Sequence, residues 1–275
     1  MIVALVDNGS IEAAAHHNLR AVADLIGRRV GCQVHAVSWR HSDRIAADAL
    51  KGVAALTLAP WLTGQLAAGE RQFIFIPFFI SAQGAIGSAL RRDLAQFQQS
   101  AVDFKFTFCD GLAARGAIAE IVAARIRETI ATQGLTQPPV IVVDHGGPSP
   151  SSASLRDELT ATIQAELKTE VGRVAAASME GDDHPHNHPL FAAQLGALGF
   201  ERGDVVIAPL FLSPGKHAGP DGDLARIARK ACEQGNPRTN PRRCHFTDLI
   251  GSHPLAAEVL ATSLRETLAN LSAPS

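Results

Sequence analysis

The two halves of this chain repeat one pattern of short apolar runs. Val6-Asp7-Asn8-Gly9 matches Val143-Asp144-His145-Gly146 at an offset of 137 residues. Three further matches follow in the same order, at offsets between 132 and 140 residues, and pair 34–40 with 174–180, 76–81 with 208–213, and 119–121 with 257–259. A self-match at a nearly constant offset indicates a duplicated unit. The Gly- and Pro-rich stretch 134–139 marks the joint between the copies.

Each copy alternates strand-like runs with helix-like segments. The segments between the runs place apolar residues three and four apart, as at Leu19, Val22, Ala23 and Ile26. This alternation is typical of parallel βα units. We expect strands at 2–6, 34–38, 73–77, 104–108, 140–143, 171–178, 205–209 and 244–249. Ser154 and Asp157 resemble a capping box at the start of the helix after residue 147.

The predicted fold class is therefore α/β. We expect two tandem flavodoxin-like lobes, at residues 1–134 and 139–275, each a four-stranded parallel sheet flanked by helices. In the commonest doubly wound order, the first strand of a lobe lies between its second and third strands. Ligands then bind at the carboxyl ends of the strands, where the winding reverses.

Two Gly-rich loops in the second half each carry a histidine at such a strand end. His145 follows the lobe's first strand and His217 its third, so both imidazoles flank the predicted crevice. Glu180 follows the second strand. Two imidazoles and a carboxylate suit a borderline divalent metal such as Co²⁺, Fe²⁺ or Ni²⁺.

The first half keeps the scaffold but not these side chains. Asn8 stands at the place of His145, Ala85 at that of His217 and Arg40 at that of Glu180. A loop histidine is ordinarily bonded to backbone, but two in equivalent loops, both absent from the sister copy, indicate an active site in the second half. For Glu180 the alternative is a cap for the following helix.

The remaining histidines have plainer interpretations. His184, His186 and His188 alternate in one loop, which is either simply solvated or an accessory metal site. His253 is expected to anchor the last helix, with Pro254 at its first position, and the alternative is a role in the cleft. His16 and His17 lie in a helix-like segment and are expected at the surface.

Composition excludes several classes of protein. The net charge of −2 argues against a nucleic-acid partner, and no apolar run approaches the roughly 18 residues of a membrane span. Cys32, Cys109, Cys232 and Cys244 lack CxxC spacing, which favours reduced thiols and a cytoplasmic location. We also expect no signal peptide, because the first residues have neither a basic region nor an Ala-x-Ala site. An α/β hydrolase is disfavoured, because no Gly-x-Ser-x-Gly follows a strand.

The motifs jointly resemble the class II tetrapyrrole chelatases, most closely the CbiX/SirB-type sirohydrochlorin chelatases. They are Asp144-His145-Gly146, Met179-Glu180, the run 209–219 (PLFLSPGKHAG) and the run 251–255 (GSHPL). The resemblance spans essentially residues 140–270, with a fainter copy over 1–133. The family usually has Ser at the position of Gly147, often places its histidine-bearing half first, and has a shorter connection than residues 181–189.

The resemblance implies two similar lobes and a lyase that inserts Co²⁺ or Fe²⁺ into sirohydrochlorin or a related tetrapyrrole, for cobalamin or sirohaem synthesis. The residues matching His145 and His217 would bind the metal and accept pyrrole protons, and Glu180 would assist. No cofactor is expected beyond the substrate metal, with Ni²⁺ as a further candidate, and a fused tandem is compatible with a monomer. Contacts to the carboxylate-rich substrate are expected from Lys216, Gly146, Gly147, Ser213, Arg40 and Arg115. The alternative is a non-enzymatic metal or tetrapyrrole carrier.

Overall fold

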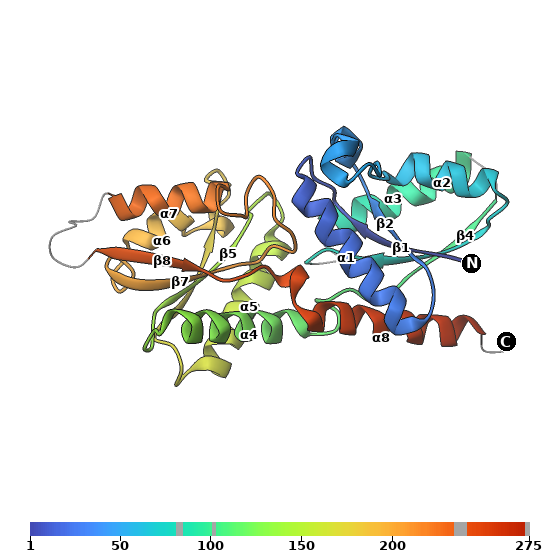
Figure 1. The fold of residues 1–275 in the computed structure, drawn as a ribbon. Helices are drawn as coiled ribbons and strands as arrows, with labels where there is room; N and C mark the ends of the chain where they lie inside the picture. The colour runs from blue at the N-terminus through green and yellow to red at the C-terminus, as the bar shows by residue number, and fades with distance from the viewer. Residues whose placement is uncertain (81–84, 101–102, 234–240, 273–275) are drawn as a thin grey trace. The chain divides into compact units, whose positions relative to one another are not determined.

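The computed structural model describes residues 1–80, 85–100, 103–233 and 241–272, which form two four-stranded parallel sheets (Figure 1). The sheet orders are β2-β1-β3-β4 and β6-β5-β7-β8. The strands are β1 (Ile2–Asp7), β2 (Val34–Ser38), β3 (Gln72–Pro77), β4 (Lys105–Phe108), β5 (Val140–Asp144), β6 (Val174–Ser178), β7 (Gly203–Pro209) and β8 (Arg242–Phe246). The predicted fold class and strand order are confirmed. The third sequence match ends at Ser81, outside the described residues.

Helices connect the strands and cover both faces of each sheet (Figure 1). They are α1 (Ala13–Val30), α2 (Leu58–Ala67), α3 (Ala85–Ser100), α4 (Ala117–Gln133), α5 (Pro150–Leu167), α6 (Phe191–Gly196), α7 (Asp223–Glu233) and α8 (Pro254–Ser272). Gly31, at φ 77°, ends α1 in the left-handed conformation that glycine adopts without strain. At the other end of the chain, α8 begins at Pro254 as expected, and the ring of His253 accepts a hydrogen bond from the Leu255 N–H at 3.2 Å.

Contacts divide the chain into two compact units. Unit 1 is Met1–Ala117 with Gly251–Ser275, and unit 2 is Ile118–Ile250. These bounds differ from the predicted lobes at 1–134 and 139–275, because the helix after each sheet's last strand belongs by its contacts to the other unit. Helix α8 packs against α1, where Arg265 donates to the Arg29 carbonyl at 2.8 Å.

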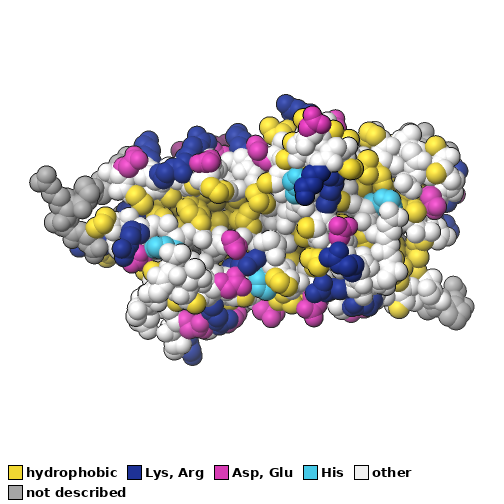
Figure 2. Space-filling view, in the orientation of Figure 1, with side chains coloured by type: hydrophobic (Ala, Val, Ile, Leu, Met, Phe, Trp, Pro, Cys, Tyr) yellow, Lys and Arg dark blue, Asp and Glu magenta, His cyan; other side chains and the backbone are white. Residues whose placement is uncertain are grey.

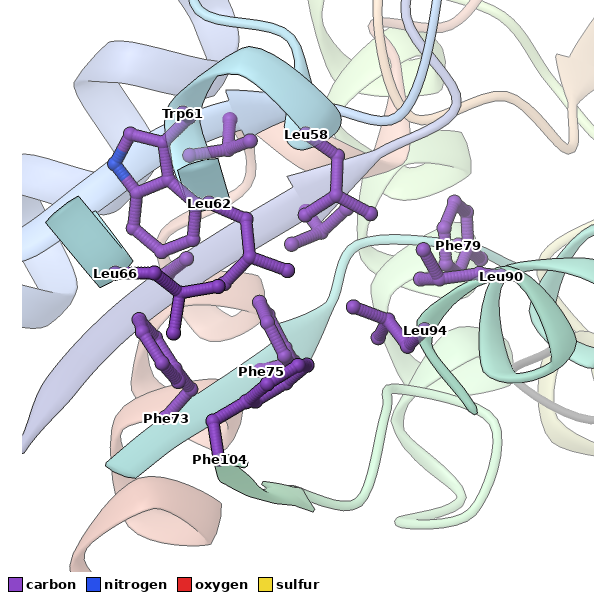
Figure 3. Packing of buried hydrophobic residues seen from close by; sticks show 13 residues of the cluster. Leu58, Trp61, Leu62, Leu66, Phe73, Phe75, Phe79, Leu90, Leu94 and Phe104 are labelled. Carbon is purple, nitrogen blue, oxygen red and sulfur yellow. The ribbon is translucent and has the colours of Figure 1, made fainter. Parts of the chain in front are cut away.

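The core of unit 1 is unusually rich in aromatic rings (Figure 3). Trp61 of α2 packs edge-on to Phe73 and Phe75 of β3, with ring centroids 6.0 and 6.3 Å apart. Phe104 adds a further edge-on contact to Phe73 at 5.7 Å. Edge-to-face pairs of this kind add about 0.5–1.5 kcal/mol beyond the area they bury.

The core of unit 2 uses aliphatic side chains in place of these rings. Ile141 and Val143 of β5 and Ile207 of β7 are fully buried against Phe191 of α6 and Leu224 of α7. Because β5 is buried on both faces, its sequence reads as a continuous apolar run. This run ends at Asp144, so the following residues leave the core at the carboxyl edge of the sheet.

Two local predictions were wrong. Helix α5 begins at Pro150, with Ser149 before it, so Ser154 lies inside the helix and caps nothing. Proline is favoured at a first helical position because its φ is already helical. The helix therefore begins at Pro150, before the predicted capping box. Strand β8 begins at Arg242 and ends at Phe246, earlier than expected, because its ladder with β7 runs from the Gly203–Arg242 pair to the Ile207–Phe246 pair.

His16 is buried, contrary to the expectation that it lies at the surface. It is 1% exposed on α1, and neither ring nitrogen has a hydrogen-bond partner among the described residues. Its neighbour His17 is partly exposed and contacts the Ala49 carbonyl at 3.0 Å. Burial, with smaller contributions from Arg20 and His17, lowers the pKa of His16 from 6.5 to about 4.

This burial predicts a pH dependence of stability. The unfolded chain takes up a proton on His16 as the pH falls through 6.5, whereas the folded chain does so only near 4. His16 therefore destabilises the fold progressively below pH 6.5, by roughly 2 kcal/mol at pH 5 relative to pH 7. Chemical denaturation of His16→Leu at both pH values should show a correspondingly smaller loss than the wild type. An equal loss in both proteins would contradict the assignment.

The outer surface has no dominant sign of charge on the face drawn in Figure 2, where basic and acidic side chains are interspersed. This distribution agrees with the net charge of −2. In the described part of the chain, no helix combines the length and apolar character that a membrane span requires.

Candidate functional site

The loops at the carboxyl ends of the two sheets have the same backbone connections. In unit 1 the Arg40 N–H donates to the Asn8 carbonyl at 3.2 Å, and in unit 2 the Glu180 N–H donates to the His145 carbonyl at 3.1 Å. The structure therefore places His145 and Glu180 where the duplicated scaffold places Asn8 and Arg40. The scaffold is shared, and the side chains differ.

Gly146 lets these two loops approach each other closely. Its φ is +81°, and a Cβ on it would lie 2.0 Å from the carbonyl oxygen of Glu180. Gly9 in unit 1 has the same geometry: its φ is +86°, and a Cβ on it would lie 1.7 Å from the carbonyl oxygen of Arg40. A larger residue would force apart the strand ends that carry His145 and Glu180.

The two predicted histidines lie side by side. The ring centroids of His145 and His217 are 4.6 Å apart, and the rings are nearly perpendicular at 86°. Phe211 is a further ring neighbour of His145, with ring centroids 6.4 Å apart. His145 is 47% exposed and His217 28% exposed, so a ligand can reach both rings.

The contacts of His145 fix which of its nitrogens carries the proton. Its Nδ1 lies 2.9 Å from the Gly146 carbonyl oxygen and 3.6 Å from Oε1 of Glu180. A carbonyl oxygen only accepts, so Nδ1 carries the hydrogen and Nε2 keeps a lone pair. Glu180 is thus near enough to attract the ring electrostatically without replacing this hydrogen bond.

His217 is oriented in the same way by Asp223 at the start of α7. Its Nδ1 lies 2.6 Å from Oδ2 of Asp223, which leaves Nε2 with the lone pair. A carboxylate behind a histidine is the usual outer partner of a metal-binding imidazole. Burial first, and the neighbouring His145 second, lower the pKa of His217, while Glu180 acts in the opposite direction. Asp223 was not predicted from the sequence, although it lies just six residues after His217.

The three side chains do not form a closed metal cage. Among the described residues, no group of three or more His, Cys, Asp and Glu side chains meets the geometry of a metal site. The structure thus brings together two rings, with one carboxylate near His145.

The histidine loop after Glu180 folds back onto the His145 loop. His186 donates from Nε2 to the Gly147 carbonyl at 2.9 Å, and its ring stacks on His184 with centroids 5.4 Å apart. His188 Nε2 lies 3.1 Å from the Asp182 carbonyl oxygen. An accessory metal role for these three histidines stays a prediction, and in two of them Nε2 already has a backbone partner.

A buried arginine underlies both loops and was not predicted. Arg156 of α5 is 2% exposed and hydrogen-bonds to the Ser178 hydroxyl at the end of β6. It also donates to the His186 carbonyl at 3.2 Å and lies 3.7 Å from the Asp144 carboxylate. Its counterpart at the 137-residue offset is Leu19, so the sister copy offers no sequence signal for this role.

The predicted substrate contacts are distributed over both units. Lys216 is exposed beside His217, and Ser213 is partly exposed in the same loop. Arg40 and Arg115 lie in unit 1, where Arg40 pairs with Asp93 at 3.0 Å and Arg115 pairs with Glu266. Both arginines therefore already bind carboxylates.

A separate cavity of about 630 Å³ lies behind the His217 loop. Pro214, Ala218 and Leu224 line it, together with Cys232 and Cys244, whose sulfur atoms are 3.7 Å apart. Neither His145 nor His217 is among its lining residues. Its largely apolar wall does not suit a carboxylate-rich ligand, so we do not assign it to the site.

Known protein structures share this fold over the full length of the chain. SirB from Bacillus subtilis with Fe³⁺ is 14% identical, with a TM-score of 0.66 and coverage of 98% of this chain and 97% of that chain. SirB from Bacillus subtilis subspecies spizizenii in complex with cobalt is also 14% identical, with a TM-score of 0.63 and the same coverage. CbiX, described as the terminal enzyme for siroheme biosynthesis in denitrifying bacteria, is 20% identical, with a TM-score of 0.64 and coverage of 97% and 99%.

Sequence comparison agrees over the second half. The family model named CbiX matches residues 139–267, which include both histidine loops, Glu180 and most of α8. A comparison with curated protein sequences gave no match. Residues 139–267 thus match the CbiX family model, and the two sheets of the chain have the fold of SirB and CbiX.

Proposed function

We propose that this chain inserts Co²⁺ or Fe²⁺ into sirohydrochlorin or a closely related tetrapyrrole, with His145 and His217 as metal ligands and proton acceptors. The observation that carries the proposal is the ring pair, 4.6 Å apart, with each Nδ1 bonded and each Nε2 keeping its lone pair. Imidazole nitrogens suit both metals. The metal is a substrate here, so a site with two imidazoles leaves positions open for the incoming nitrogens.

The proton balance also favours a pair of imidazoles. Insertion of M²⁺ exchanges two pyrrole N–H protons for one metal ion. When a histidine releases the metal, the same Nε2 lone pair becomes available for a proton. A lowered pKa keeps His217 neutral near pH 7, as a metal ligand must be. Glu180, 3.6 Å from His145 Nδ1, would balance the charge of a protonated ring and pass protons to solvent.

Basic side chains would bind the substrate carboxylates. Lys216 is adjacent to His217 in sequence and exposed, so it is the first candidate in unit 2. Backbone groups of Gly146 and Gly147, and the Ser213 hydroxyl, would add contacts from the same loops. In unit 1, Arg40 and Arg115 would exchange Asp93 and Glu266 for substrate carboxylates of the same chemistry.

An anaerobic absorbance assay separates an enzyme from a carrier. Metal-free sirohydrochlorin is mixed with Co²⁺ or Fe²⁺, with and without the protein. A chelatase increases the rate of conversion to the metallated spectrum, saturates in both substrates and turns over repeatedly. A carrier binds one partner without increasing the rate, and that result would favour the alternative. Ni²⁺ in a parallel series tests the breadth of metal use.

Asp223 gives a prediction for this mechanism. Asp223→Asn keeps the size of the side chain but removes the negative charge behind His217. Loss of such an outer partner typically reduces metal affinity or activity about 10- to 100-fold. We expect a reduction in that range in Co²⁺ affinity, measured by anaerobic titration. An unchanged affinity would contradict a metal-binding role for the His217 ring.

The proposal also covers the location, the oligomeric state and the cofactors of the protein. The four cysteines are free thiols, which is compatible with the cytoplasmic location expected from sequence. A monomer remains the proposed state, because one chain carries both lobes of the fold. We propose no cofactor apart from the metal substrate.

A further inference from the structure

One peptide group connects His145 to the histidine loop. The carbonyl of Gly146 accepts the Nδ1–H of His145 at 2.9 Å. The N–H of the same peptide, on Gly147, donates to Oδ1 of Asn187 at 3.3 Å. The Asn187 amide also donates to the carbonyls of Gly147 at 3.1 Å and Gly181 at 3.0 Å. This buried side chain, 2% exposed, therefore fixes the peptide plane against which the His145 ring rests.

We propose that Asn187 is a positioning residue that sets the tautomer of His145. It holds the Gly146–Gly147 peptide so that the carbonyl keeps the proton on Nδ1 and leaves the lone pair on Nε2. Hydrogen bonds in a chain polarise one another, so the bond at the N–H strengthens the carbonyl as an acceptor. The inference rests on the proposed function, in which Nε2 binds the metal. Asn187 itself touches neither substrate.

We call the hydrogen bonds from the Asn187 side chain to the N–H and carbonyl of Gly147 a clamp. Unit 1 contains the same clamp, but without a histidine beside it. Ser10, the counterpart of Gly147 at the 137-residue offset, donates its N–H to Ser42 Oγ at 3.3 Å, and its carbonyl lies 3.1 Å from that hydroxyl. Ser42 lies in the connection after the second strand of unit 1, as Asn187 does in unit 2. The clamp thus belongs to the duplicated scaffold. In unit 2 the longer side chain of Asn187 bonds to two carbonyls and one N–H, next to the proposed metal ligand His145.

Neighbouring residues hold the clamp in place. Gly181 has φ +92°, and a Cβ on it would lie 2.2 Å from Nδ2 of Asn187, so glycine is needed for the amide to approach. His186 donates to the Gly147 carbonyl, and Arg156 donates to the carbonyl of His186. The connection after Glu180 therefore orients the His145 loop through these hydrogen bonds.

The test is Asn187→Ala, examined in metal-free protein by ¹⁵N NMR of the imidazole nitrogens. The wild type should show His145 as one tautomer with the proton on Nδ1, and the variant a mixture of both. Anaerobic Co²⁺ titration should give a dissociation constant raised about 10-fold, the lower end of the range for outer partners of metal-binding histidines. The metal KM should rise in parallel, with kcat at saturating metal within about twofold of the wild type.

Two variants control for a purely structural effect. Ser42→Ala removes the equivalent clamp from unit 1, and Asp183→Ala changes an exposed residue of the same loop. Both should leave the His145 tautomer and the Co²⁺ dissociation constant unchanged. If Asn187 only stabilised the fold, Asn187→Ala would lower the melting temperature but leave the His145 tautomer and the Co²⁺ dissociation constant unchanged. That result would overturn the proposal.

A second substitution keeps the proposal testable if Asn187→Ala does not fold. Asn187→Asp retains an oxygen for the Gly147 N–H but turns a carboxylate toward two carbonyl oxygens. It should be less stable yet keep the Nδ1–H tautomer. Wild-type protein with the proton of His145 on Nε2 would overturn the proposal. Because the NMR readout needs no turnover, a wild type that fails to chelate would overturn the proposed function separately.

Discussion

His145→Ala and His217→Ala should each abolish metal insertion while leaving the fold intact. Each substitution removes one of two imidazoles whose rings are 4.6 Å apart, and with it a metal ligand and a proton acceptor. Loss of a positioned proton-transfer group alone typically costs about 10²- to 10⁴-fold in rate. We therefore expect at least about a 10³-fold loss in the anaerobic insertion assay, because the metal ligand is lost as well.

Both rings are partly exposed, so their removal should not open a cavity in the core. Circular dichroism and the melting temperature of both variants should match the wild type. Asn8→Ala, at the place of His145 in the sister unit, is the matched control and should retain full activity. Retained insertion by both histidine variants would end the proposal.

Gly146→Ala should be the most damaging single change outside the two rings. The new Cβ would lie 2.0 Å from the Glu180 carbonyl oxygen, and φ is +81°, which strains any residue with a side chain. A left-handed backbone costs about 1–3 kcal/mol and the clash adds to it, so we expect roughly 3–5 kcal/mol less stability in chemical denaturation. Insertion should fall by at least about 10²-fold, because the Gly146 carbonyl no longer holds His145 in place.

Gly9→Ala separates these two effects. It meets the same obstruction in unit 1, where the Arg40 oxygen lies 1.7 Å from the new Cβ. We expect a comparable loss of stability, with insertion by the remaining folded protein reduced much less than by Gly146→Ala. Equal losses of insertion in the two variants would show that Gly146 acts through the fold alone.

The sequence predicted the fold because its strongest signals are local. Runs such as Val140–Val143 are buried on both faces of a sheet, and this burial requires continuous apolar residues. The strand order was predicted from the commonest doubly wound order, and the duplication applies it to both units. The bounds of the two units were harder to predict from the sequence, because the packing of α4 and α8 determines which unit each helix joins. Nothing in residues 254–272 alone specifies that α8 packs against α1.

The site likewise contains residues that the sequence predicted and residues that it did not. His145, His217 and Glu180 were predicted because strand ends of a parallel sheet meet at one edge. Asp223, Asn187 and Arg156 were missed because each acts through hydrogen-bond geometry that residue spacing does not encode. His16 shows the same limit, since its own helical segment does not reveal that it is buried in the folded unit.

Anaerobic Co²⁺ titration with X-ray absorption tests most directly the central claim that His145 and His217 share one metal ion. The wild type should bind one Co²⁺ per chain with two imidazole nitrogens at about 2.1 Å, a distance typical of metal–histidine bonds. His145→Ala and His217→Ala should each reduce that count to one and weaken binding. An imidazole count unchanged in both variants, as binding to His184, His186 and His188 would give, would contradict the account.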